Sequence, residues 1–163
     1  MIGKVMQDAI NEQINKELYS SYLYLSMAAY FENENLPGFA HWMHIQEGEE
    51  REHAMKFYRH LTERGGRVIL KAIDAPAVEW KTSLDLFKEV ASHEAKVTSM
   101  INNLYELALK EKDYPAQVLL QWFISEQVEE EKNAAEIVAN LQLIDARGTA
   151  VLMLDHTLSK RGE

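Results

Sequence analysis

The stretch from Gly65 to Thr82, GGRVILKAIDAPAVEWKT, is the feature of the sequence that most restricts the topology. It lies between two long segments with helical periodicity and has to carry the chain from the end of one to the start of the other. A helix of about 28 residues is about 42 Å long, and about 13 residues of extended chain cover that distance. The stretch is therefore long enough to run the whole length of a helical bundle. We expect the helix after it to start at the same end as the helix before it.

Proline and capping residues divide the rest of the chain into long segments. Pro37 and Pro115 suit the first turn of a helix, where a missing N–H does no harm, and Thr82-x-x-Asp85 resembles a capping box. No alternation of apolar and polar residues of the kind that favours strands competes with the helical pattern. We expect helices at 5–33, 37–64, 83–112, 115–143 and 147–159.

The lengths of the connections set the topology. Only a few residues join the first helix to the second and the third to the fourth, and short links force antiparallel neighbours. The predicted fold is all-α: a four-helix bundle over residues 1–145 with one long crossover between helices two and three. A short C-terminal fifth helix, within residues 146–163, completes the same domain.

The composition narrows the functions that the chain can have. Lys and Arg number 17 against 26 Asp and Glu, and the resulting charge of −9 repels phosphates and attracts cations, so we expect no nucleic-acid partner. The absence of cysteine excludes disulfides, zinc fingers and thiolate-bound iron–sulfur clusters. No segment has the apolar length of a signal peptide or a membrane span, so we expect a cytoplasmic protein.

The apolar stripe of each long helix is broken close to its midpoint by glutamate or its neighbours. Antiparallel helices of similar length place their midpoints level, so these side chains should converge inside the core. A lone Glu on such a stripe is more often a partly exposed carboxylate paired with Lys or Arg. Four helices with acids at one level and no Lys or Arg there are better explained by a bound metal pair. The residues are Glu17, Glu50, His53, Glu94, Gln127 and Glu130.

Glu50 and His53 form a Glu-x-x-His pair, whose spacing stacks both side chains on one face of a helix. Ligation dominated by oxygen suits hard cations, and Fe(III) is harder than Fe(II), so the site should favour oxidation of iron. Glu50 is the best candidate to bridge two metals. Tyr24, two turns from Glu17 on the same face, has two open interpretations: a catalytic residue that gives the site a hydrogen bond or an electron, or an ordinary core residue.

Four segments together resemble the non-haem ferritins of bacteria and archaea: ELYSSYLY at 17–24, EEREH at 49–53, HE at 93–94 and QWFISEQVEEEK at 121–132. The resemblance covers essentially the whole chain and implies a ferritin-like fold with a ferroxidase centre of two irons. It implies a first iron on Glu17, Glu50 and His53, and a second on Glu50, Glu94 and Glu130 with Gln127 as a direct ligand or a neighbour. A third iron position is implied at Glu49, Glu126, Glu129 and Glu130, whereas Glu131 is expected on a solvated acidic face.

The sequence departs in two places from related families. Bacterioferritins and many di-iron oxidases carry a second Glu-x-x-His on the fourth helix, where this chain has Gln127-x-x-Glu130. Bacterioferritins also place a haem-ligating Met after the bridging Glu, where this chain has Arg51, so no haem is expected.

The fifth helix carries an apolar run at 150–154 that a single bundle has no open seam to bury. In large ferritins this helix packs around the four-fold axes of a cage of twenty-four subunits, and the resemblance implies the same homo-oligomer here. The alternative is a helix that caps the end of its own bundle.

The resulting hypothesis is an iron-storage ferroxidase that takes Fe(II) and O2 or H2O2 and stores Fe(III) in a cage. The alternative is a soluble di-iron oxidase or peroxidase of the rubrerythrin kind, without storage. A purely structural bundle does not account for the four level carboxylates.

Overall fold

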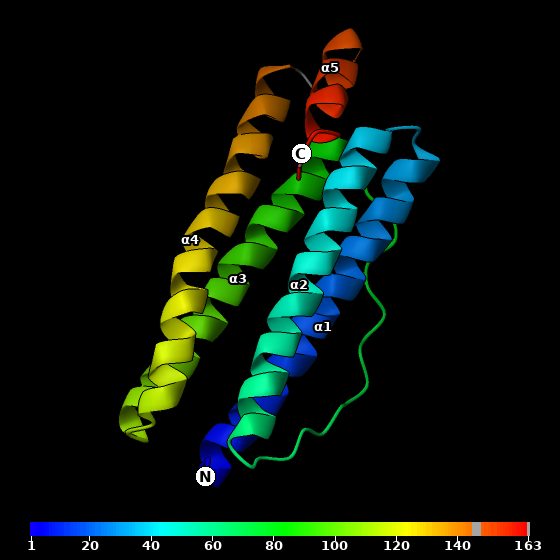
Figure 1. The fold of residues 1–163 in the computed structure, drawn as a ribbon. Coiled ribbons are helices and arrows are strands. Elements are labelled where there is room, and N and C mark those ends of the chain that lie inside the picture. The colour runs from blue at the N-terminus through cyan, green and yellow to red at the C-terminus, as the bar shows by residue number, and fades with distance from the viewer. Residues whose placement is uncertain (145–147, 163) are drawn as a thin grey trace.

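The computed structural model describes residues 1–144 and 148–162, and every regular element within them is a helix (Figure 1). The helices are α1 (Lys4–Asn33), α2 (Pro37–Glu63), α3 (Ser83–Lys110), α4 (Tyr114–Leu143) and α5 (Thr149–Leu158). The predicted all-α fold is confirmed, and the four long helices begin and end within two residues of the predicted positions. The predicted start of the fifth helix, at 147, lies outside the described residues.

The helix ends follow from the residues that suggested them. Pro37 and Pro115 both lie in the first turn of their helices. Thr82 accepts a hydrogen bond at its hydroxyl from the Asp85 N–H at 3.0 Å, which satisfies one of the free donors at the start of α3. At the end of α2 the chain turns through Gly65, whose φ of +73° favours a residue without a Cβ.

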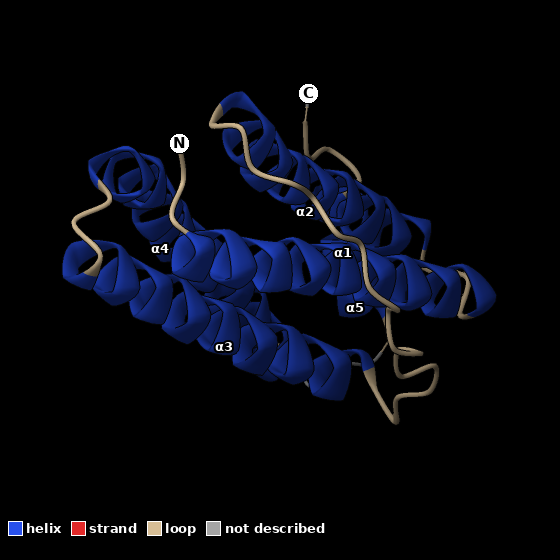
Figure 2. Cartoon of the chain, turned by 90° about the horizontal axis from the view of Figure 1, so that it is seen from below, coloured by secondary structure: helices blue, strands red, loops and turns tan. Residues whose placement is uncertain are grey.

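The crossover runs along α1 for the length of the bundle, as Figures 1 and 2 show. Polar side chains of α1 hold its backbone at intervals. The Asn11 side chain donates to the Arg67 carbonyl at 3.0 Å and accepts from the Ile69 N–H at 2.8 Å. Further along, Ser26 donates to the Ala77 carbonyl at 2.7 Å. The crossover therefore carries the chain from the end of α2 to the opposite end of the bundle, as its length predicted.

Two apolar clusters fill the bundle, one on each side of a buried polar layer. In one cluster Phe31 stacks on Phe39 with ring centroids 4.9 Å apart. In the other Phe57 stacks on Phe123 at 4.1 Å. Because both clusters consist of buried, closely packed side chains, they hold the helices in register, and the polar residues between them have little freedom to move.

Helix α5 packs against the start of α2 in its own chain. Asp155 accepts a hydrogen bond from the Phe39 N–H at 2.9 Å, so α5 supplies the cap that the N-terminus of α2 lacks. Gly38 allows this approach, because a Cβ there would lie 1.7 Å from the Asp155 carbonyl oxygen. The opposite face of α5 leaves Leu152 and Met153 largely exposed. One face of α5 thus caps the end of its own bundle, as in the alternative to packing around a cage axis. The other face of α5 is exposed.

None of the helices in the described residues combines the length and apolarity needed to cross a bilayer.

Candidate metal centre

The polar layer between the two apolar clusters contains all six side chains that the stripes placed at one level. The four long helices each contribute to it, and every member is between 1 and 5% exposed. The layer draws on one residue from α1, two from α2, one from α3 and two from α4: Glu17, Glu50, His53, Glu94, Gln127 and Glu130.

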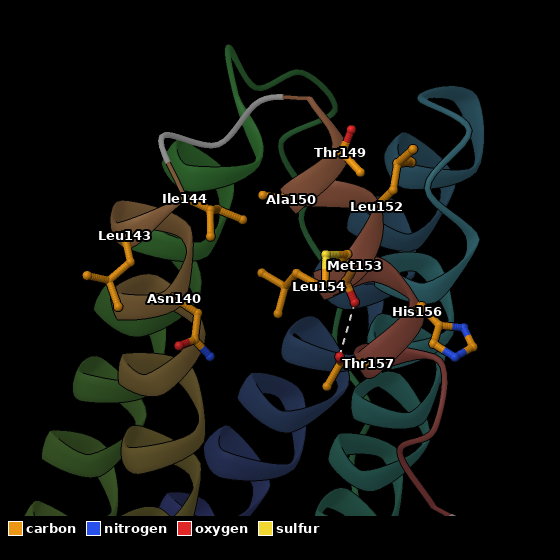
Figure 3. A pocket seen from close by; sticks show the side chains of 10 residues that line it. All are labelled: Asn140, Leu143, Ile144, Thr149, Ala150, Leu152, Met153, Leu154, His156 and Thr157. Atoms are coloured by element: carbon orange, nitrogen blue, oxygen red, sulfur yellow. Dashed lines mark hydrogen bonds between the residues drawn. The ribbon is translucent and has the colours of Figure 1, made fainter.

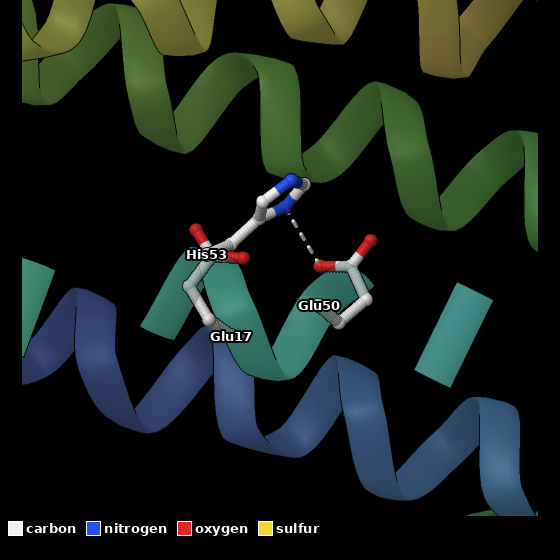
Figure 4. Close-up of side chains that lie close together, drawn as sticks. All are labelled: Glu17, Glu50 and His53. Atoms are coloured by element: carbon white, nitrogen blue, oxygen red, sulfur yellow. Dashed lines mark ion pairs between the residues drawn. The ribbon is translucent and has the colours of Figure 1, made fainter. Parts of the chain in front are cut away.

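Glu17, Glu50 and His53 form the tightest group in this layer. Each offers one ligand atom, and these atoms all lie within 4.8 Å of one another. His53 Nδ1 is 3.5 Å from Glu50 Oε2, because the two residues are three apart on α2 and share one face (Figure 4). Glu17 reaches the same point from α1. Two carboxylates and one imidazole in such a group can hold a divalent cation.

A second group forms on the other side of the same imidazole. Ligand atoms of His53, Glu126 and Glu130 also lie within 4.8 Å of one another. His53 Nε2 is 3.9 Å from a carboxylate oxygen of Glu126. Glu126 is only partly buried, so this group lies nearer the surface than the first.

Three glutamine side chains hold the carboxylates in place. Gln13 donates to Glu17 at 2.8 Å. Gln46 donates to Glu130 at 2.8 Å and to Glu50 at 3.2 Å, linking α2 to α4. Gln13 and Gln46 were not predicted as site residues from the sequence. Their spacing could have indicated this role. Each glutamine precedes a glutamate by four residues, which places the two side chains on the same helical face, and donates a hydrogen bond to it.

Gln127, the third of these glutamines, also acts as a donor. Its side-chain amide donates to the Glu94 carboxylate at 3.1 Å and to the Glu94 backbone carbonyl at 3.3 Å. In this geometry Gln127 orients Glu94.

The layer contains buried polar atoms without a hydrogen-bond partner in the described part of the chain. They are Glu17 Oε2, Glu50 Oε2 and Gln46 Oε1. Leaving such atoms unsatisfied costs about 1–3 kcal/mol each, and more for charged groups. Such oxygens, gathered at one point inside a core, are suitable ligands for a cation.

Burial and mutual repulsion change how these acids ionise. Burial, and then the charge of Glu50, raises the pKa of Glu17 to about 8. Burial and the charge of Glu94 raise the pKa of Glu130 to about 7. The pKa of Glu50 is raised well above its ordinary value, mainly by burial and then by Glu94. A cation in the layer would reverse this effect, because it favours the ionised carboxylates.

Tyr24 touches the layer directly. Its hydroxyl donates to a carboxylate oxygen of Glu94, and the ring is fully buried. Burial, followed by the negative charge of Glu94, raises the pKa of Tyr24 well above its ordinary value, so the phenol keeps its proton. The tyrosine is close enough to hold a proton, or to pass an electron, at one ligand.

His93 lies on the flank of α3 that faces α1, beside the polar layer. It packs edge-on against Tyr24, with ring centroids 5.9 Å apart. Its Nε2 is 2.8 Å from the hydroxyl of the buried Ser20, and burial lowers the pKa of the imidazole to about 4. The side chain is half-buried, because side chains of α1 cover part of this flank of α3.

The other acids that the resemblance assigned are not all gathered at the site. Glu49 is turned onto Arg161, with 2.5 Å between its carboxylate and the guanidinium, and Glu129 is exposed. Glu131 is exposed as predicted and accepts a hydrogen bond from Thr98.

A pocket of about 360 Å³ between α2 and α4 reaches the layer from outside. It ends at His53, and Glu49, Glu52 and Glu126 lie along it. Trp122 forms part of its wall, with its ring 5.5 Å from that of His53 and Lys56 lying 4.2 Å from the ring centroid. Three glutamates against one lysine give the wall of this pocket a negative charge, which attracts cations.

Comparison with known proteins gives one family. A family model described as the ferritin-like domain matches residues 7–144. The bacterial non-heme ferritin of Bacteroides fragilis (strain 638R) is 41% identical over 161 residues, which are 99% of this chain and 100% of the relative. That of Staphylococcus aureus (strain USA300) is 35% identical, over 99% of this chain and 97% of its own.

Solved structures agree with these matches. An open pore ferritin from the hyperthermophilic archaeon Archaeoglobus fulgidus is 49% identical, with a TM-score of 0.96 over 98% of each chain. A humanized archaeal ferritin is 47% identical, with a TM-score of 0.98 over 100% of each chain.

Proposed function

The chain belongs to the ferritin family, and from this premise we propose that it oxidises Fe(II) at the buried polar layer and stores the Fe(III) product inside a cage. The observation that carries the proposal is that Glu17 and Glu50 each have a buried carboxylate oxygen without a hydrogen-bond partner in the described part of the chain. These two residues and His53 offer ligand atoms that lie within 4.8 Å of one another. A folded protein has little reason to keep such oxygens unless a cation binds them.

The two proposed ligand sets share Glu50. Glu17, Glu50 and His53 hold the first iron. Glu50, Glu94 and Glu130 hold the second, with Glu50 between the two and Gln127 fixing Glu94. Glutamines donating to Glu17, Glu50 and Glu130 support this assignment, because oriented carboxylates lose little freedom when a metal binds.

The chemistry is a transfer of one electron from each iron. Two Fe(II) give two electrons to O2, which is thereby reduced to the level of peroxide, and the ferric ions then take up oxide or hydroxide from water. Carboxylate oxygens favour this direction because Fe(III) is the harder ion. Tyr24, hydrogen-bonded to Glu94, is proposed to hold a proton or lend an electron during the transfer.

A third iron position is proposed beside the pair. Ligand atoms of His53, Glu126 and Glu130 lie within 4.8 Å of one another. Glu49 and Glu129, whose charges act on each other, are the further acids on that side. The position borders the acidic pocket between α2 and α4, so it would lie on the path of iron entering or leaving.

Assembly into twenty-four subunits is proposed from the family and from the exposed face of α5. A pocket of about 610 Å³ lies between the end of α4 and α5, and Figure 3 shows its apolar lining. Leu143, Leu152 and Met153 are 84%, 59% and 69% exposed there, which is costly for a lone subunit in water. The family implies that copies of the same helix cover this surface. A cytoplasmic location and the absence of a nucleic-acid partner stay predictions.

The test of the site is anaerobic Fe(II) titration by calorimetry in two buffers that differ in protonation enthalpy. We expect at least two Fe(II) per chain, with protons released at pH 7, because carboxyls with raised pKa values give up protons when metal binds. Binding of less than one Fe(II) per chain, or binding without proton release, would contradict the assignment.

A further inference from the structure

The carboxylate of Glu49 is occupied by a side chain from the C-terminal segment. Arg161 donates to Glu49 Oε2 at 2.5 Å, and the two side chains are 19% and 43% exposed. Glu49 lies on the wall of the acidic pocket beside His53 and Glu126. Its carboxylate therefore stands at the edge of the proposed third iron position but is held by the guanidinium instead.

Arg161 is itself held firmly. Its guanidinium lies 4.3 Å over the ring of Trp42, which is almost fully buried, and donates to the Trp42 carbonyl at 3.2 Å. The Arg161 carbonyl accepts a hydrogen bond from His41 Nε2 at 3.0 Å. An arginine stacked on an aromatic ring and hydrogen-bonded on both sides loses little further freedom when it pairs with a carboxylate.

The position of Arg161 depends on α5. Asp155 caps α2 through the Phe39 N–H, and Gly38 lets the two backbones meet. Only a short turn after Leu158 separates this anchor from Arg161. The ion pair with Glu49 thus connects α2, next to the proposed third iron position, to the segment that follows α5.

We propose that Arg161 is a positioning residue that holds Glu49 out of the third iron position, so that a cation must displace the guanidinium to recruit this ligand. The proposal rests on the proposed function, since it concerns an iron beside the oxidised pair. Displacement leaves the guanidinium only its contacts with Trp42, so iron at the third position loosens the end of α5. The pair thereby keeps the third position weak, which suits a site that passes iron onward.

The coupling works in both directions. If Arg161 weakens iron binding at the third position by some factor, iron there weakens the contact of Arg161 with Glu49 by the same factor. A partly exposed ion pair contributes little, but a charge-assisted hydrogen bond from a fixed arginine contributes more. We expect a factor of about 5, which corresponds to the low end of coupling between sites.

The experiment is anaerobic Fe(II) titration of the assembled protein, comparing wild type with R161Q, R161K and K160Q. Lys160 is the matched control, because it is exposed, carries the same charge one residue away, and makes no ion pair within the described residues. In R161Q the third Fe(II) should bind about 5-fold more tightly while the first two are unchanged. R161K, which keeps the charge but loses the planar fork, should lie between R161Q and wild type, and K160Q should match wild type.

A second readout separates this role from a general effect of charge. Amide hydrogen exchange in Thr149–Leu158 should speed up in wild type when the third Fe(II) binds, and should be fast in R161Q from the start. An unchanged third affinity in R161Q and R161K, or an equal gain in K160Q, would overturn the proposal while the iron pair stands. If wild type binds no pair of irons, the proposed function itself fails, whatever Arg161 does.

Discussion

Glu50→Ala should slow the oxidation of Fe(II) by about 100-fold or more when the protein is mixed with Fe(II) in oxygenated buffer. Glu50 lies between the two proposed iron positions and accepts a hydrogen bond from Gln46. It stands three residues from His53, with their nearest ligand atoms 3.5 Å apart. Removing Glu50 takes a ligand from both proposed iron positions at once. Two Fe(II) are then no longer held side by side to give their two electrons to one O2.

The measurement is stopped-flow absorbance of Fe(III) formation, with assembly checked by native mass. Glu63→Ala is the matched control, because Glu63 is an exposed glutamate at the end of the same helix, outside both metal groups. His53→Ala should be nearly as slow as Glu50→Ala, since His53 belongs to both groups of ligand atoms. Rates within about 2-fold of wild type for both variants would refute the site.

The second large effect is on the stability of the iron-free protein. Burial raises the pKa of Glu17 to about 8 in the folded chain, against an ordinary value of 4.5 that applies once the chain is unfolded. Between these values the folded state holds a proton that the unfolded state has lost. The free energy of unfolding therefore falls as pH rises from about 5 to 8, and this contribution is fully present only below the unfolded pKa.

Glu17→Gln should remove most of this pH dependence, because glutamine keeps the shape and cannot ionise. At pH 8 the iron-free variant should be more stable than wild type by about 3 kcal/mol, or roughly 6–12 °C in thermal midpoint. The same variant should oxidise Fe(II) slowly, so stability rises as function is lost.

Thermal unfolding of iron-free protein at pH 5, 6, 7 and 8 measures this directly. Glu12→Gln is the control: it lies on the same helix, pairs with Lys71 at the surface and is 54% exposed, and such pairs contribute little. A wild-type midpoint that does not fall between pH 5 and 8 would mean that Glu17 is not held as a strained, protonated acid.

Local rules and the lengths of the connections were enough to predict the bundle. Proline can begin a helix but not continue one, so Pro37 and Pro115 fixed two helix starts, and the capping pair at Thr82 fixed a third. The crossover followed from its length alone. The level of the buried acids followed in turn, because antiparallel helices of similar length align their midpoints.

Contacts between side chains that are far apart in sequence could not be predicted in this way. The ion pair of Arg161 with Glu49 joins residues whose separation no periodicity describes, and it turns an expected iron ligand away from its site. Gln13 and Gln46 did show a regular spacing, yet glutamine on a helix is common enough that only the observed hydrogen bonds give it a role.

The most direct test of the account is aerobic loading with excess Fe(II), followed by gel filtration with iron and protein measured in the same fractions. We expect iron to elute with a very large particle, at a ratio far above the two or three irons per chain that the ligand groups can hold. Iron that stops at two or three per chain would contradict storage, and would leave an oxidation site of the di-iron enzyme kind.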